Sequence, residues 1–170
     1  MTQNSALAQA ESLLLAPFSL TEGDLSRTFG QILTHQVDYA DLYFQYSRSE
    51  AWSLDEGIVK SGSFNIDQGV GVRALSGEKT AFAYSDDISS RALGDAANAV
   101  RAIAGAGQNS KFGQFFPSTV ARSLYVPNDP IASLPAEAKV KLLERLEGFA
   151  RALDPRVLQV MASIAGEYEV

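Results

Sequence analysis

The sequence predicts an α/β domain of the α+β kind, with an antiparallel sheet of about five or more strands and helices packed on one face. Apolar and polar residues alternate through much of the segment from residue 38 to 86, which is the period of β-strands. Helical spacing fills the first 36 residues and recurs at 88–104 and 135–153. Since 46% of the 170 residues are hydrophobic and 20% are charged, the chain has the composition of one folded domain.

The N-terminal segment is predicted to form two helices separated by the sequence APFSL. Thr21 opens the second helix, and Asp24 three residues later gives a weak capping-box pattern. The apolar positions that follow at helical spacing are Leu25, Phe29, Ile32 and Leu33. The single histidine, His35, is interpreted as a cation at the end of this helix, where the helix dipole favours it.

The stretch NIDQGVGVRALSGEKTAFAYSDD, residues 65–87, contains a Gly-x-Gly that resembles a phosphate-binding loop. Such a loop needs a helix N-terminus directly after it, because the free N–H groups of the helix hold the anion. Here the alternating pattern continues through the turn SGEK into TAFAYS, so the stretch is predicted to be a β-hairpin. Strand glycines such as Gly71 indicate close approach of a neighbouring backbone, a bulge, a tightly packed helix, or a peptide or partner strand.

The C-terminal part predicts two more helices and a final strand. The helix at 88–104 stops at Gly105, and the helix at 135–153 ends at the Asp154-Pro155 pair. Its predicted apolar face consists of Val140, Leu143, Leu146, Phe149, Ala150 and Leu153. The segment 156–170 alternates as a strand that expects a continuation or a neighbour. The intervening loop carries Phe112, Phe115 and Phe116, which either tuck under the domain or dock on another surface.

The residues that bear chemistry do not form a recognisable catalytic pattern. One histidine and no cysteine disfavour a self-contained zinc site, which usually takes three protein ligands. Asp86 and Asp87 are interpreted as helix-capping carboxylates, and Asp55-Glu56 as a solvated turn. A net charge of −6 disfavours direct binding of nucleic acid or of an anionic membrane. The absence of cysteine and of an N-terminal signal pattern favours the cytoplasm.

Three sequences, DYADLYFQ, WSLDEGIVKSGSFNIDQGVGVRALSGEKTAFAYSDDIS and YVPNDP, resemble the N-terminal domain of TldD-like proteins of the TldD/PmbA family. This resemblance covers about residues 20–170 and is strongest from Tyr39 to Ser89. The family, long described as modulators of DNA gyrase, implies a cytoplasmic zinc metallopeptidase acting on unfolded or small peptides. It also implies a heterodimer with a PmbA/TldE-like subunit. The family's metal-binding His-Glu-x-x-x-His motif does not occur in this sequence.

The resemblance therefore implies that residues 1–170 are a TldD-like N-terminal domain, truncated before the catalytic C-terminal domain. No catalytic or metal residue is expected in this chain, and zinc is expected only in the full-length parent. The expected partners are a PmbA/TldE-like subunit, the protein's own C-terminal domain and a peptide substrate. The candidate residues of a substrate or partner cleft are Gly69, Val70, Gly71, Val72 and Arg73. The alternative function is a stand-alone module that binds a peptide by adding it as a strand to a sheet edge.

Overall fold

The computed structural model describes residues 3–33, 37–104 and 129–170, which fold as two compact units that share two long strands. The first unit holds the helices α1–α3, strand β3, β1 up to Tyr46 and β2 from Asp67 onward. The second unit holds β1 from Ser47, β2 up to Ile66, helix α4 and strand β4. The predicted roles of His35 and of the three phenylalanines at 112–116 lie outside the described residues.

The first unit begins with the two helices that the sequence predicts, α1 (Gln3–Leu14) and α2 (Glu22–Ile32), separated by a short 3₁₀ helix, η1 (Ala16–Phe18). Thr21 caps α2: its hydroxyl accepts from the backbone N–H of Asp24 at 3.3 Å, and the Asp24 carboxylate accepts from the backbone N–H of Thr21 at 3.0 Å. These reciprocal bonds satisfy N–H groups that the first helical turn leaves free. The predicted capping box is confirmed.

The sheet is antiparallel and has the strand order β3-β2-β1-β4 within the described residues. Strand β1 (Tyr39–Asp55) turns at Glu56 and Gly57, which both have positive φ, into β2 (Ile58–Ser76). The described residues therefore form four strands where about five or more were expected, while the fold class is confirmed. The count is lower because β1 and β2 run unbroken for 17 and 19 residues, so the segment forms fewer and longer strands than expected. The segment from Ser47 to Glu50 continues β1, where it pairs with β4.

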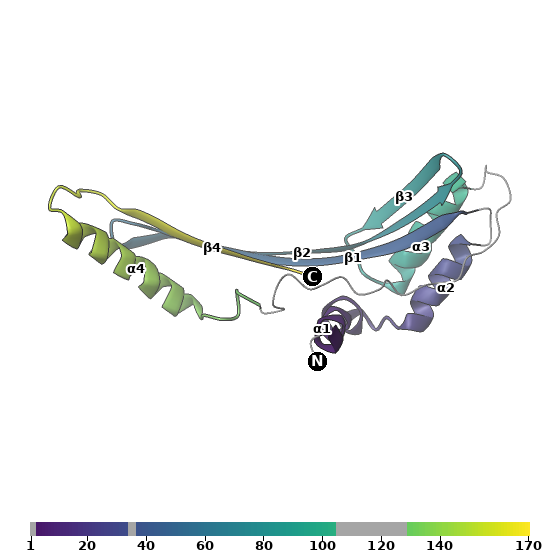
Figure 1. Ribbon diagram of the computed structural model, residues 1–170, viewed down its shortest axis with the longest axis horizontal. Helices are drawn as coiled ribbons and strands as arrows, with labels where there is room; N and C mark the ends of the chain where they lie inside the picture. The colour runs from purple at the N-terminus through teal and green to yellow at the C-terminus, as the bar shows by residue number, and fades with distance from the viewer. Residues whose placement is uncertain (1–2, 34–36, 105–128) are drawn as a thin grey trace. The chain divides into compact units, whose positions relative to one another are not determined.

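The core of the first unit lies between one face of the sheet and the helices α2 and α3. Strand β3 (Lys79–Ser85) pairs with β2 in a register that places Val72 opposite Ala83, and α3 (Ser90–Ala104) packs on β3 and α2. Figure 1 shows α2 and α3 on the same side of this part of the sheet. The most completely buried core side chains include Ile32, Val70, Val72, Ile88, Leu93, Ala97 and Val100. The predicted hairpin is confirmed, since Gly69–Ala74 lie in a strand.

The second unit packs helix α4 (Ala136–Leu153) along strand β4 (Met161–Glu169), which pairs with the second half of β1. The register places Trp52 opposite Ile164 and Leu54 opposite Ala162. Leu54 and Leu143 are the most deeply buried apolar side chains of this unit, with exposed fractions of 1% and 0%. None of the helices in the described segments is long and apolar enough to span a membrane.

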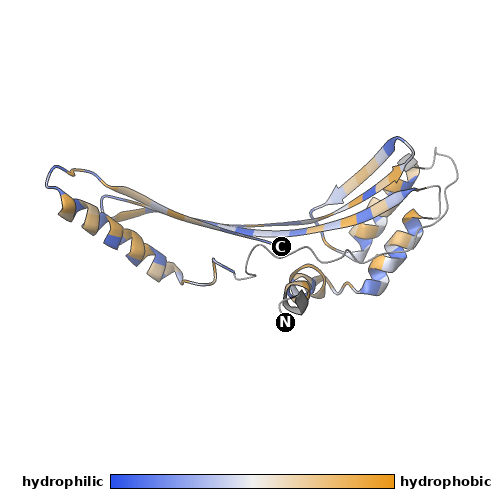
Figure 2. Ribbon diagram, in the orientation of Figure 1, coloured by the Kyte–Doolittle hydropathy of each residue, from blue (hydrophilic) through white to orange (hydrophobic). Residues whose placement is uncertain are grey.

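Helix α4 presents a different face to the sheet than its sequence predicts. The buried stripe consists of Lys139, Leu143 and Glu147, whereas Leu146 and Phe149 of the predicted apolar face are 49% and 65% exposed. Figure 2 shows hydrophilic and hydrophobic residues side by side along this helix. The predicted face is therefore wrong at Leu146, Phe149 and Leu153, while Leu143 is buried and Val140 and Ala150 are half-buried. Lys139 and Glu147 can be buried because each finds an ion-pair partner in the second unit.

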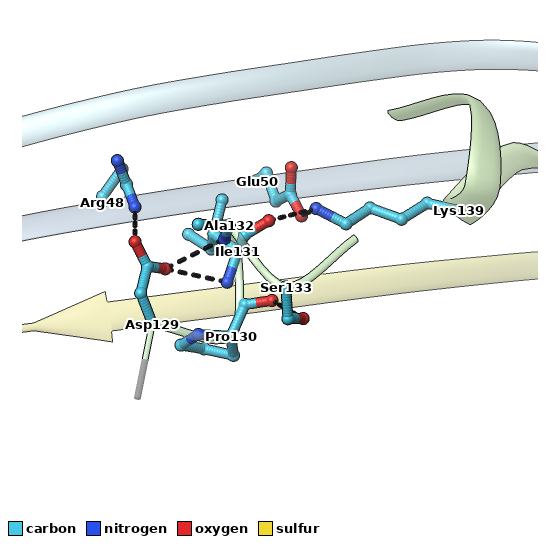
Figure 3. A network of polar contacts seen from close by, with 8 residues as sticks. All are labelled: Arg48, Glu50, Asp129, Pro130, Ile131, Ala132, Ser133 and Lys139. Atoms are coloured by element: carbon cyan, nitrogen blue, oxygen red, sulfur yellow. Dashed lines mark hydrogen bonds and ion pairs between the residues drawn. The ribbon is translucent and has the colours of Figure 1, made fainter. Parts of the chain in front are cut away.

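The buried charges belong to a polar network that fixes the start of α4 on strand β1 (Figure 3). The Lys139 ammonium forms an ion pair with Glu50 and donates a hydrogen bond to the Ile131 carbonyl at 2.7 Å. Next to it, Arg48 pairs with Asp129, whose carboxylate also accepts from the backbone N–H of Ile131 at 2.9 Å. Each buried charge thus has an opposite charge or a backbone group as its partner.

Candidate functional site

The candidate cleft residues lie in β2 and point alternately to the two faces of the sheet. Val70 and Val72 face the helices and are 2% and 0% exposed, so they belong to the core of the first unit. Gly69, Gly71 and Arg73 lie on the opposite face, because successive residues of a strand point to opposite sides. The structure therefore divides the predicted set into two core residues and three residues of the opposite face, where Gly69 is half-buried, Gly71 is buried and Arg73 is exposed.

Four large aromatic side chains surround this open side of the sheet. The pairing of β2 with β3 places Tyr84 opposite Gly71 and Phe82 opposite Arg73, and the two rings lie 6.1 Å apart in a stacked arrangement. Tyr39 and Tyr43 come from the same face of β1. The exposed fractions are 53% for Tyr39, 58% for Tyr43, 56% for Phe82 and 80% for Tyr84. We call these four residues, with Gly71 and Arg73, the open aromatic face.

Neighbouring atoms of the same sheet occupy the space where the side chains of the strand glycines would lie. A Cβ atom on Gly71 would lie 3.0 Å from the ring of Phe82 and 3.9 Å from the Cβ of Tyr43. On Gly69 it would lie 2.8 Å from the backbone oxygen of Ser85. Gly71 thus lets an aromatic ring lie across β2, while Gly69 lets the backbone of β3 approach closely.

Arg73 is the basic residue of the open aromatic face, and its charge is already paired. Its Nε atom lies 3.1 Å from each carboxylate oxygen of Asp41, and its guanidinium lies 6.0 Å from the ring centroid of Tyr39. The hydrogen bonds to Asp41 and its negative charge raise the pKa of Arg73 above the ordinary value, so the guanidinium stays charged. Because the pair is neutral overall, the face offers aromatic and hydrogen-bonding surface more than net charge.

The side chains of the chain do not fit a catalytic zinc ion. The sequence has one histidine and no cysteine, and the described residues contain no cluster of three or more histidine, aspartate or glutamate side chains that could hold a metal. The candidate carboxylate Asp87 instead accepts from the Ser89 hydroxyl at 2.7 Å, and that hydroxyl accepts from the backbone N–H of Ala92 at 3.1 Å. Asp87 therefore helps to cap α3 through Ser89.

The sequence-based candidates for a cleft do not include Tyr39 and Tyr43, the two tyrosines that β1 contributes to the open face. All four aromatic residues of that face sit at alternate positions of predicted strands, on the face opposite to the apolar core positions. Solvent-facing strand positions usually carry polar side chains, so aromatic residues at these positions were the available signal.

Comparisons with known proteins match nearly the whole chain. Residues 40–104 match the family described as "PmbA/TldA metallopeptidase domain 1". A protein of Haemophilus influenzae named "Metalloprotease TldD homolog" is 45% identical over 168 residues, which are 96% of this chain and 34% of that protein. The chain thus spans about a third of the length of the curated relatives that it matches.

Solved structures show the same fold at low sequence identity. TldE from Thermococcus kodakarensis superposes with a TM-score of 0.60 at 15% identity, over 87% of this chain and 33% of that one. A Bacteroides thetaiotaomicron protein described as a modulator of DNA gyrase superposes with a TM-score of 0.62 at 12% identity, over 87% of this chain and 35% of that one. Together, the sequence and fold matches place the chain in the PmbA/TldD family as a TldD-like sequence that includes the family's first domain.

Proposed function

We propose that this chain is the non-catalytic N-terminal domain of a TldD-like zinc metallopeptidase that cleaves unfolded or small peptides. The observation that carries the proposal is the 45% identity, over almost the whole chain, to a protein named as a metalloprotease. That relative is about three times as long as the segment matched here, so it has room for a catalytic domain in addition. Zinc ligands would then come from a His-Glu-x-x-x-His motif outside these 170 residues.

In this proposal, the open aromatic face forms one wall of the chamber that receives the peptide. Exposed aromatic rings bury a large apolar area when they contact a ligand, and the tyrosine hydroxyls can pair with peptide groups. A wall of this kind excludes water from the reaction and limits the size of the substrate. The proposed partners are the protein's own C-terminal domain and a PmbA/TldE-like subunit, and the proposed compartment is the cytoplasm, which suits a cysteine-free chain.

The test begins with the gene, read beyond the codon for Val170 in search of a His-Glu-x-x-x-His motif. The protein encoded by that longer frame is then assayed for casein cleavage, with Tyr43→Ala and Tyr84→Ala introduced together. We expect KM to rise with little change in zinc content, because the two rings contact substrate and not metal. Lys141→Ala, at an exposed site of α4, is the matched control and should leave kcat and KM unchanged.

Two results would contradict the proposal. A frame that ends without the motif would remove the catalytic domain that the proposal requires. An unchanged KM in the tyrosine variant would show that the open aromatic face does not contact the substrate.

A further inference from the structure

A groove of about 520 Å³ runs between strand β3 and helix α3 in the first unit. Ala83 and Ser85 line it from the strand, and Ala92, Ala96 and Ala99 line it from the helix. The three helix positions are four and three residues apart, so they form one stripe along α3. These five side chains are no larger than serine and leave space beside the strand, while larger side chains complete the lining: Tyr84, Asp87, Arg91 and Asp95.

The strand next to this groove is an edge of the sheet. β3 stands at the end of the strand order and pairs with β2 on one side. No described residue pairs with β3 on its other side. Alternate backbone N–H and C=O groups of an edge strand point away from the sheet and can accept a further strand. The free hydrogen-bonding groups of β3 and the groove between β3 and α3 therefore lie side by side.

The residues on the two faces of β3 determine which side chains would suit a strand added at its edge. Residues of that strand in line with Ala83 and Ser85 would point toward the alanines of α3, where only small side chains fit. Residues in line with Phe82 and Tyr84 would lie beside the stacked rings, which attract cations. The added strand should therefore alternate between small apolar and longer basic residues.

The charges around the groove favour a basic ligand. Asp87 and Asp95 line it, Asp86 lies at the end of β3, and the whole chain has a net charge of −6. The one basic residue of the lining, Arg91, lies 3.6 Å from a carboxylate oxygen of Asp95. Three carboxylates against one guanidinium leave this end of the groove negative.

We propose that β3 and α3 form a docking site for an extended basic peptide with small apolar residues at alternate positions, which binds as a further strand of the sheet. The site lies at the sheet edge and needs no metal or catalytic step. It goes beyond the proposed peptidase function and can be tested separately. In a peptidase, such a site would hold a segment of substrate away from the bond that is cleaved.

The first experiment uses the 170-residue chain and a short fluorescein-labelled peptide in which valine and lysine alternate. We expect saturable binding by fluorescence anisotropy, and no binding when glutamate replaces lysine in the peptide. Ala99→Leu fills the groove from an exposed helix position and should weaken binding about tenfold, the effect of roughly 1.4 kcal/mol. Ala102→Leu, exposed on the same helix but outside the groove, is the matched control and should bind normally.

The second experiment leaves the protein unchanged and methylates the peptide on alternate backbone nitrogens. Only one of the two alternate sets of N–H groups faces β3, so methylation of that set should abolish binding while methylation of the other set preserves it. Equal binding of both methylated peptides would overturn strand addition, and equal affinity of Ala99→Leu and Ala102→Leu would overturn the groove. Neither outcome affects casein cleavage by the longer protein, so the failure of this inference is distinguishable from failure of the proposed function.

Discussion

Replacement of Lys139 by methionine should be one of the most destabilising single substitutions in the second unit. The Lys139 side chain is 5% exposed and its partner Glu50 is 11% exposed, so both charges lie almost entirely out of water. The ammonium also donates to the carbonyl of Ile131 at 2.7 Å. Methionine fills a similar volume but leaves a buried carboxylate and a buried carbonyl oxygen without their donor.

The expected loss follows from the cost of an unpaired buried charge. Removal of one partner of a buried ion pair typically costs about 3–5 kcal/mol, and the orphaned carbonyl contributes within that range. Replacement of both partners, as Lys139→Met with Glu50→Leu, removes the charge mismatch altogether. The double variant should therefore recover most of the loss and unfold within about 1 kcal/mol of the original chain, or be more stable.

Urea unfolding followed by circular dichroism measures these differences, with Lys141→Met as an exposed control on the same helix. The control should stay within about 0.5 kcal/mol of the original chain. A single variant that is equally close to the original would refute the reasoning, because the ion pair would then not be buried in solution. A double variant no more stable than the single one would refute the assignment of the loss to the stranded Glu50 carboxylate.

Three further predictions concern the strand glycines, helix α4 and the cap of α2. Gly69→Ala should lower stability in thermal unfolding by about 1–3 kcal/mol, because its Cβ would lie 2.8 Å from a backbone oxygen. Gly71→Ala should cost less than about 1 kcal/mol, because its Cβ would lie 3.0 Å from a ring that can move. Leu143→Ala should cost about 2–5 kcal/mol in urea, and Phe149→Ala, at a 65% exposed position, less than about 0.5 kcal/mol. Hydrogen bonds from the N-cap residue Thr21 hold the pKa of Asp24 below its ordinary value of 3.8. The contribution of Asp24 to folding stability is therefore complete above pH 3.8 and is lost as the pH falls through the lowered pKa. The stability difference between the original chain and Asp24→Asn should therefore shrink on acidification below pH 3.8, and a difference that grows would contradict this sign.

The sequence predicted local structure well where one pattern determined it. The hairpin that contains Gly71, the two N-terminal helices and the cap at Thr21 follow from periodicity and turn chemistry, which act over a few residues. The number of strands was overestimated because strand length depends on pairing with β4, a partner far along the chain. Pairing of this kind leaves no local signal in the sequence of β1 itself.

The face of helix α4 and the open aromatic face were harder to predict for a related reason. Hydrophobicity alone assigns Phe149 to the core and Lys139 to solvent, but a lysine with a carboxylate partner can be buried. The candidate set at Gly69 to Arg73 marked the correct strand, yet only the alternation along β2 separates Val70 and Val72 from the residues of the open side. Tyr84 lies on that side through the pairing of β3 with β2 in the predicted hairpin, and Tyr39 through its position in β1.

Metal analysis of the purified 170-residue chain, together with a casein-cleavage assay, tests whether these residues lack a catalytic site of their own. The chain supplies one imidazole, His35, and no thiolate, so we expect no stoichiometric zinc and no cleavage. Addition of zinc during purification should not change either result. One tightly held zinc per chain, with cleavage that disappears in His35→Ala, would contradict the account and make these residues an enzyme in their own right.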